Sequence, residues 1–323
     1  MSQPKVLVSR RWPAAVETEL QKKYDVTFNT SDVAMTTAQF RDALQTYDAI
    51  LPTVTDKIGA DVFDGMNART KFMGNFGVGY THIDGAAAQA AGIVVTNTPD
   101  VLSDCTADIA LTLMLMAARR AGEGEREVRS GNWSGWRPTH LLGQRMTGKT
   151  LGIIGFGRIG QEVAKRAHYG FGMKIVVQNR SQVKDEVLIK TNARQVGSVS
   201  ELLERSDFVS LHCPGGDANR HMISTEQFEL MKDNAILINT ARGEVVDDTA
   251  LIHALKTNQI AAAGLDVFDG EPAVNPGYLS CENAVLLPHL GSATTETRED
   301  MGFRVLDNLN DFFAGIEPRD RVL

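Results

Sequence analysis

The chain of 323 residues carries 33 Lys and Arg against 40 Asp and Glu, which gives a formal net charge of −7 at pH 7. This length suits two domains of ordinary size, and the mildly acidic balance argues against a nucleic-acid partner. The three cysteines, Cys105, Cys213 and Cys281, are far apart, so we expect neither a disulfide framework nor a metal site.

The longest apolar stretch, residues 109–118, lies between Asp108 and Arg119. It is about half the length of a membrane span and predicts a buried helix instead. The apolar run near the N-terminus is too short for a signal peptide. We therefore expect a cytoplasmic protein with no membrane contact.

Short apolar segments alternate with helical patterns along the N-terminal third. This alternation predicts βαβ units and a doubly wound parallel sheet. The strands are expected at 5–9, 25–28, 49–52, 72–75 and 93–97, and the helices at 13–23, 37–45, 58–65 and 83–91. The motif G-x-G-x-x-G does not occur in this part, so we do not expect it to bind a nucleotide.

A long helical pattern over 103–127 predicts one buried helix, and the loop after it contains Trp133 and Trp136. An amphipathic pattern from Thr294 onward predicts a terminal helix that packs back on one of the domains. Between them, a second series of strands is expected at 151–154, 174–178, 208–212, 235–239, 261–265 and 284–287.

The first strand of this second series runs into a glycine-rich turn, LGIIGFGRIG, over 151–160. Gly155 permits the tight turn, Gly157 lets the backbone approach a pyrophosphate, and Gly160 lets the following helix pack on the strand. The helix dipole and free N–H groups then face an anion. The turn predicts a dinucleotide site.

The end of the next strand reads VVQNRSQVK and lacks the acidic residue that usually binds the ribose 2′-hydroxyl of NAD. Arg180 can instead pair with a 2′-phosphate, Ser181 can donate a further hydrogen bond, and Lys184 adds charge. These residues favour NADPH over NADH. In the alternative interpretation Arg180 is a solvated loop residue and the protein accepts both cofactors.

Later strand ends carry Arg242, Asp266, Glu271 and His289, and the carboxyl ends of parallel strands meet at one edge of a sheet. Reduction of a carbonyl by hydride needs a proton donor and a cation. His289 suits the first role and Arg242 the second, while Glu271 on the other imidazole nitrogen would fix the tautomer. Alternatively, His289 is a structural histidine and Arg242 forms a surface ion pair.

Several ordered motifs extend this interpretation through nearly the whole chain. They are NFGVGYTHID at 75–84, TNTPDVLSDCTADIAL at 96–111, TLGIIGFGRIGQEVAKRA at 150–167, NTARGEVVDDTAL at 239–251, GLDVFDGEP at 264–272 and PHLGSAT at 288–294. In these motifs the chain resembles the D-isomer-specific 2-hydroxyacid dehydrogenases, and among them the glyoxylate/hydroxypyruvate reductases.

The resemblance implies roles for individual residues. Arg242 would bind the substrate carboxylate and keto oxygen, His289 would be the general acid and base, and Glu271 would be its partner. Further substrate contacts are implied at Val54, Val78, Gly79 and Trp136. Cofactor contacts are implied at Thr106, Gly155, Phe156, Gly157, Arg158, Ile159, Gly160, Asn179, Arg180, Ser181, His212, Cys213, Pro214, Thr240, Ala241, Arg242, Asp266, His289 and Gly291.

Trp136 resembles a tryptophan that, in these reductases, reaches from one subunit into the active site of its partner. The resemblance therefore implies a homodimer in which the partner completes the substrate pocket. In the alternative interpretation Trp136 is simply buried in a dimer interface.

We expect an α/β protein of two doubly wound domains, Rossmann- or flavodoxin-like, with parallel sheets and an interdomain cleft. The substrate domain is placed at 1–102 plus 290–323 and the NAD(P)-binding domain at 103–289. The expected reaction is reduction of glyoxylate to glycolate or of hydroxypyruvate to D-glycerate, with NADPH preferred and NADH possible. The alternatives are a D-2-hydroxyacid dehydrogenase of other specificity and a dinucleotide-gated, corepressor-like binding module.

Overall fold

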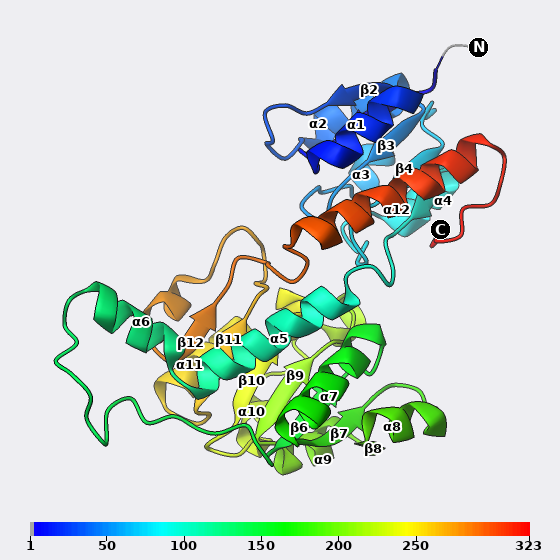
Figure 1. Cartoon of the computed structure of the whole chain (residues 1–323). Coiled ribbons are helices and arrows are strands. Elements are labelled where there is room, and N and C mark those ends of the chain that lie inside the picture. Colours follow the sequence, from blue (N-terminus) through cyan, green and yellow to red (C-terminus); the bar gives the residue numbers. More distant parts are fainter. Residues whose placement is uncertain (1–2) are drawn as a thin grey trace. The chain divides into compact units, whose positions relative to one another are not determined.

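The computed structural model describes residues 3–323 and consists of two compact units (Figure 1). One comprises the described residues up to Leu102 together with Ser292–Leu323, and the other comprises Ser103–Gly291. Each unit is built on an open sheet of parallel strands with helices connecting them. The predicted α/β class with two parallel sheets is therefore confirmed.

The first unit has a five-stranded sheet in the order β2-β1-β3-β4-β5. Its strands are β1 (Lys5–Val8), β2 (Asp25–Phe28), β3 (Ala49–Leu51), β4 (Phe72–Gly74) and β5 (Val94–Thr96). Its helices are α1 (Ala14–Lys23), α2 (Thr37–Thr46), α3 (Ala60–Phe63), α4 (Gly85–Ala90) and α12 (Thr295–Phe313). Every residue of β3 and β4 is buried, as expected for central strands whose two faces are covered.

The terminal helix α12 packs on α1 and β4 within this unit, and two glycines allow the close approach. A Cβ on Gly74 of β4 would lie 2.5 Å from Val305 of α12, and a Cβ on Gly302 would lie 2.7 Å from Val16 of α1. The predicted amphipathic helix is present, and its apolar face is buried in the unit to which the N-terminal part of the chain belongs.

The second unit has a seven-stranded sheet in the order β12-β11-β10-β9-β6-β7-β8. Its strands are β6 (Thr150–Ile154), β7 (Lys174–Gln178), β8 (Ala193–Gln195), β9 (Phe208–Leu211), β10 (Ile236–Asn239), β11 (Ala262–Leu265) and β12 (Ala284–Leu286). Its helices are α5 (Ser103–Ala118), α6 (Ala121–Arg129), α7 (Arg158–Phe171), α8 (Asp185–Thr191), α9 (Val199–Arg205), α10 (Thr225–Leu230) and α11 (Asp248–Lys256).

Helices cover both faces of this second sheet and form two apolar cores. One core includes Leu113 of α5 and Val163 of α7, and the other includes Leu202 of α9, Phe228 of α10 and Leu251 of α11. The strands between them are nearly continuous apolar runs, which is the pattern of a parallel sheet buried on both faces.

The prediction of one continuous helix over 103–127 is wrong, because two helices, α5 and α6, occupy this stretch. Between α5 and α6, Arg120 adopts a left-handed conformation with φ 51°. The N–H of Gln144 donates to the carbonyl of Ala118 at 2.7 Å. In a continuing helix that carbonyl would accept from the N–H of Gly122. A segment distant in sequence therefore helps to end α5, and the periodicity of the sequence gives no signal of this.

Two short pairings were also absent from the sequence prediction. The edge strand β8 has only three residues and an exposed Arg194, so it lacks an apolar alternation. Near the C-terminus, Arg321 forms an antiparallel bridge with Thr96 at the end of β5. Within residues 3–323, no helix has both the length and the apolar character needed to cross a membrane.

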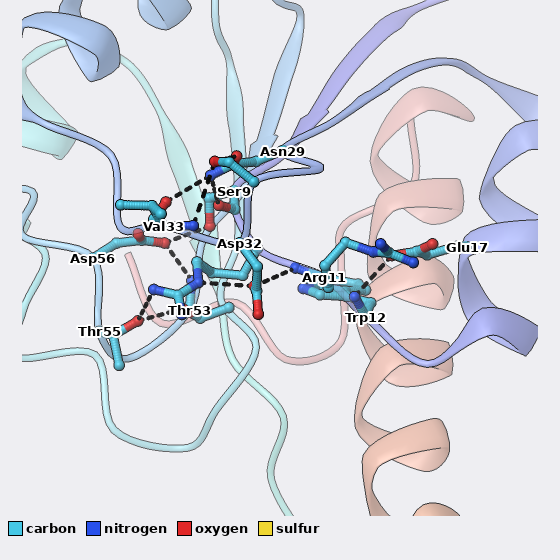
Figure 2. Close-up of polar contacts among 12 residues, drawn as sticks. Ser9, Arg11, Trp12, Glu17, Asn29, Asp32, Val33, Thr53, Thr55 and Asp56 are labelled. Atoms are coloured by element: carbon cyan, nitrogen blue, oxygen red, sulfur yellow. Dashed lines mark hydrogen bonds and ion pairs between the residues drawn. The ribbon is translucent and has the colours of Figure 1, made fainter.

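A buried carboxyl, Asp56, lies beyond the carboxyl end of β3 (Figure 2). One oxygen, Oδ2, accepts hydrogen bonds from the Ser9 hydroxyl and, at 2.8 Å, from the Thr53 N–H. The other, Oδ1, has no hydrogen-bond partner among the described residues. Burial raises the pKa of Asp56 above its ordinary value, although these two donors and Arg10 oppose the shift.

We predict that Asp56→Asn changes how stability depends on pH. Folding raises the pKa of Asp56, so the folded state binds this proton more tightly than the unfolded state does. The resulting contribution to the free energy of unfolding is fully present below the ordinary pKa of an aspartate, about 4. This contribution is lost as the pH rises through the raised pKa. Urea unfolding between pH 4 and 8 should show the free energy of unfolding of the wild type falling relative to Asp56→Asn. A difference that does not vary with pH would contradict this assignment.

Candidate active site

The glycine-rich turn joins β6 to α7 in the second unit. Gly155 has φ +88°, and a Cβ there would lie 2.5 Å from the backbone nitrogen of Cys213. A Cβ on Gly160 would lie 2.5 Å from the carbonyl oxygen of Gly155. By contrast, Gly157 is exposed and has no atom within 4 Å of its Cβ position. The first and third glycines are thus required by packing, while the second faces open space.

This turn fits the pyrophosphate of a dinucleotide. The helix α7 has 14 residues and no side-chain cap on its N-terminus, so its free N–H groups and positive dipole end remain available to an anion. Arg158 adds an exposed cation at the first helical position. Phe156 is buried and Ile159 half-buried beneath the same turn.

The turn also lies where the strand order of the sheet reverses. From β6 the chain adds β7 and β8 on one side and then returns to add β9 on the other side. Dinucleotides bind at such a switch point in open α/β sheets. The residues after β9, His212 to Pro214, abut the turn there, since a Cβ on Gly155 would lie 2.6 Å from the carbonyl carbon of His212.

Neither His212 nor Cys213 is ionised at neutral pH. Burial lowers the pKa of His212 to about 3, and burial raises the pKa of the Cys213 thiol to about 11. The Nε2 of His212 lies 2.7 Å from the Ser210 hydroxyl, and its Nδ1 has no hydrogen-bond partner among the described residues. His212 can therefore take part in binding a ligand as a neutral imidazole.

Asn179 links the end of β7 to the glycine-rich turn. Its Oδ1 accepts from the N–H of Phe156 at 3.1 Å, and its Nδ2 donates to the Ser181 carbonyl at 3.1 Å. Arg180 and Ser181 are exposed at this strand end. The structure thus places a cation and a hydroxyl, and no carboxylate, directly after β7.

Arg242 follows β10 in a turn that a buried asparagine holds. Asn239 accepts from the N–H of Ala241 at 3.0 Å and donates to the carbonyl of Arg242 at 2.9 Å. The guanidinium of Arg242 in turn donates to the Ala241 carbonyl at 2.6 Å. Thr240 is also buried, and its hydroxyl has no partner among the described residues.

His289 and Glu271 form a hydrogen-bonded pair after β12 and β11. The imidazole Nδ1 lies 2.8 Å from Oε2 of Glu271, whose Oε1 accepts from the N–H of Phe268 at 2.9 Å. Burial alone would raise the pKa of Glu271. The hydrogen bond and charge of His289, the Phe268 N–H and the charge of Arg242 outweigh burial and hold this pKa below its ordinary value.

Two further charged groups, Arg242 and Asp266, interact electrostatically with this pair. Desolvation lowers the pKa of the half-buried Arg242 guanidinium from its ordinary value, while the charges of Glu244 and Glu271 oppose the shift; an arginine remains a cation at any physiological pH. Asp266 accepts from the N–H groups of Leu290 and Gly291 at 2.7 and 2.8 Å. This carboxylate fixes the backbone that follows His289.

Thr106, at the start of α5, lies beside Asp266. A Cβ on Gly291 would be 3.3 Å from Asp266 Oδ2 and 3.5 Å from the Thr106 hydroxyl. The second unit thereby holds the glycine-rich turn, the Arg180 strand end and the group of Arg242, Glu271 and His289 at the carboxyl ends of its strands.

The remaining predicted residues lie elsewhere. Val54, Val78 and Gly79 belong to the first unit, where a Cβ on Gly77 would lie 2.6 Å from the side chain of Val54. Trp136 is 82% exposed on the loop after α6, so the described chain encloses it in no pocket. His, Cys, Asp and Glu side chains in residues 3–323 form no group of three or more suited to a metal ion.

Sequence reasoning overlooked the buried asparagines that hold these turns. Asn239 interrupts the apolar run ILIN at the last position of a buried strand, and a polar residue in that place is the signal that could have revealed it. Asn75 and Asn97 stand in equivalent places after β4 and β5.

Comparison with known proteins decides the family. The model described as D-isomer specific 2-hydroxyacid dehydrogenase, NAD binding domain, matches residues 111–291. The glyoxylate reductase of Thermococcus litoralis is 44% identical over 323 residues, which cover 99% of this chain and 96% of that relative. The chain belongs to the D-isomer specific 2-hydroxyacid dehydrogenase family. The resemblance found in the sequence motifs is confirmed.

Solved structures of 2-hydroxyacid dehydrogenases agree with this membership. A D-isomer specific 2-hydroxyacid dehydrogenase from Polaromonas has 38% identity and a TM-score of 0.92, covering 99% of this chain and all of that one. An NADPH-dependent glyoxylate/hydroxypyruvate reductase from Sinorhizobium meliloti, solved with NADP and malonate, has 33% identity and a TM-score of 0.86, covering 99% and 97%. The cofactor of this dehydrogenase is a nicotinamide dinucleotide.

Two glycine substitutions in this dehydrogenase should separate folding from cofactor binding. Gly155→Ala is strained by its positive φ and by backbone contact, so we expect it to lower the free energy of unfolding by about 2 kcal/mol or more. Gly157→Ala meets no atom within 4 Å, so stability should change by less than about 0.5 kcal/mol.

The same Gly157→Ala variant should bind NADPH and NADH about tenfold more weakly or worse, because its methyl group occupies the surface that the pyrophosphate approaches. Urea unfolding and titration of cofactor fluorescence provide the two measurements. Unchanged affinity of Gly157→Ala for both cofactors would exclude this turn as the pyrophosphate site.

Proposed function

We propose that this dehydrogenase reduces small 2-keto acids with NADPH as the preferred reductant, converting glyoxylate to glycolate and hydroxypyruvate to D-glycerate. The observation that carries the proposal is the 2.8 Å hydrogen bond between His289 and Glu271 beside the charge of Arg242. In this group His289 is the proton donor, Glu271 orients the imidazole, and Arg242 is the cation that attracts a keto acid.

A reduced nicotinamide bound to this unit would supply the hydride for the keto carbon, so that the carbonyl π electrons would move to oxygen. His289 gives the resulting alkoxide a proton from Nε2, because its Nδ1 is engaged by Glu271. The Glu271 carboxylate also holds the imidazole ring in a fixed orientation. Both the new C–H bond and the new O–H bond are thereby accounted for.

Arg242 binds the keto acid as a cation that stays charged throughout turnover. The backbone N–H groups of Val78 and Gly79 bind the substrate carboxylate, and Val54 contacts the remainder of the substrate. Within the second unit, Asp266 contacts the nicotinamide carboxamide. Cofactor contacts come from Thr106 at the start of α5, from the glycine-rich turn, from residues 212–214 and 240–241, and from Gly291.

The preference for NADPH is supported by the residues after β7. Arg180 and Ser181 are exposed and no carboxylate is present at that strand end, so a 2′-phosphate meets a cation rather than a like charge. The similar reductase from Sinorhizobium meliloti is NADPH-dependent.

A homodimer is part of the proposal. Val128, Trp133, Trp136 and Leu142 are all more than half exposed on α6 and the loop that follows it, and large exposed apolar side chains so close together in sequence favour a protein partner. A second copy of the chain would cover them, with Trp136 contacting the partner's substrate. Cys213 and Cys281 are buried free thiols, which supports a reducing, cytoplasmic setting.

Initial rates with glyoxylate and hydroxypyruvate, each with NADPH and NADH, test the proposal. We expect turnover of both acids and a higher kcat/KM for NADPH. Arg180→Asp should lower kcat/KM for NADPH by about 10- to 100-fold and raise the relative use of NADH. Lys190→Asp, an equal charge change on an exposed residue of α8, serves as the control.

Absence of turnover with either acid, despite cofactor binding, would overturn the substrate assignment in favour of a bulkier keto acid. Equal rates with both cofactors in the wild type and in Arg180→Asp would show Arg180 to be a solvated residue without a role in cofactor choice.

A further inference from the structure

We propose that Asn75 and Asn97 are positioning residues that aim the backbone N–H groups of Val78 and Gly79 at the substrate carboxylate. The inference rests on the proposed function, because it concerns the same carboxylate contact. It assigns the contact's geometry to two buried amide side chains that donate to the carbonyls of the turn.

Each asparagine follows a strand of the first sheet and is buried. Asn75 follows β4 with no exposed surface, and Asn97 follows β5 with 8% exposed. The Nδ2 of Asn75 donates to the carbonyls of Gly77 at 2.9 Å and Gly79 at 3.0 Å. The Nδ2 of Asn97 donates to the carbonyl of Val78 at 2.9 Å. Three successive carbonyls are therefore held by two side chains.

Fixing these carbonyls also fixes the N–H groups that follow them. In a planar trans peptide the C=O and the next N–H point in opposite directions. The N–H of Val78 is consequently turned away from Asn75, and the N–H of Gly79 away from Asn97. In the described part of the chain, neither N–H donates to another backbone group. Two oriented donors thus remain on a turn whose Val78 side chain is exposed.

The cost of burying Asn75 supports a role beyond packing. Its Oδ1 is buried without a hydrogen-bond partner among the described residues, and an apolar residue of similar volume would avoid that desolvation. The gain over such a residue is the pair of hydrogen bonds to the turn. Because its partners are both carbonyl oxygens, only the NH₂ end of the amide can face them.

Asn97 is itself anchored by the segment near the C-terminus. Its N–H donates to the carbonyl of Asp320 at 3.2 Å. The buried carboxylate of Asp320 accepts from Arg304 of α12 at 2.6 Å and from Asn308 at 2.8 Å. A preformed donor pair of this kind binds an anion without reorganising the turn.

Kinetics and binding of Asn75→Ala and Asn97→Ala test the inference. We expect KM for hydroxypyruvate to rise about 10- to 100-fold while kcat falls by a smaller factor. The dissociation constant of oxamate, an unreactive keto-acid analogue titrated into the protein saturated with NADPH, should rise by the same factor as KM. The dissociation constant of NADPH should stay within about twofold of the wild type.

Asn29→Ala is the matched control. Like Asn75, Asn29 donates from Nδ2 to two carbonyls of the first unit, those of Ser9 and Val33 (Figure 2). Its loss should leave KM and oxamate affinity unchanged. If Asn75→Ala and Asn97→Ala alter these quantities no more than Asn29→Ala does, the inference is overturned.

Asn97→Asp provides a variant of unchanged shape in case the alanine variants unfold. Its carboxylate cannot donate to the Val78 carbonyl, whereas its protonated form can. The KM of Asn97→Asp relative to the wild type should therefore be high at pH 8 and fall as the pH is lowered. A ratio that does not change with pH contradicts the positioning role.

Oxamate titration distinguishes this inference from the proposed function. If the wild type binds oxamate but reduces neither keto acid, the substrate assignment is overturned. The asparagine variants are then compared with the wild type by their dissociation constants for oxamate alone. A wild type that reduces hydroxypyruvate while the variants match Asn29→Ala overturns only the positioning role. A wild type that neither binds oxamate nor reduces either acid overturns both.

Discussion

Parallel pairing is the constraint on which the rest of this structure depends. Every strand of a parallel sheet ends at the same edge, so the turns that follow the strands gather there with their backbone polar groups. In the second unit this edge carries the glycine-rich turn after β6, Arg242 after β10, Glu271 after β11 and His289 after β12. In the first unit it carries Asn75 and Asn97. The side chains proposed to bind and protonate the keto acid, Arg242 and His289, therefore both follow strands.

The turns at these edges are held by buried or half-buried asparagines. Asn75, Asn97, Asn179 and Asn239 each stand at or just after the end of a strand, and each bonds a backbone group of a turn at that edge. An amide side chain can both donate and accept, so one residue satisfies backbone groups that the sheet no longer pairs. The same arrangement serves turns assigned to the cofactor, to Arg242 and to the substrate carboxylate.

Sequence patterns predicted what depends on local chemistry. The strand and helix alternation predicted two parallel-sheet units, because it depends on the burial period. The three glycines predicted a dinucleotide site at the turn, because they depend on glycine conformation. The motifs indicated the family through resemblance. The end of α5 was missed because it depends on Gln144, distant in sequence, bonding Ala118. The asparagine contacts were missed for the same reason, since a motif shows which residue is present but not which carbonyl it meets.

In the proposed reaction His289, oriented by Glu271, donates the proton that completes reduction. The most direct measurement is single-turnover reduction of hydroxypyruvate by His289→Ala, with the dissociation constant of NADPH measured on the same sample. The account predicts that the rate of NADPH oxidation falls by about 10²- to 10⁴-fold, with cofactor affinity unchanged. A rate near that of the wild type would contradict it and remove His289 from the mechanism.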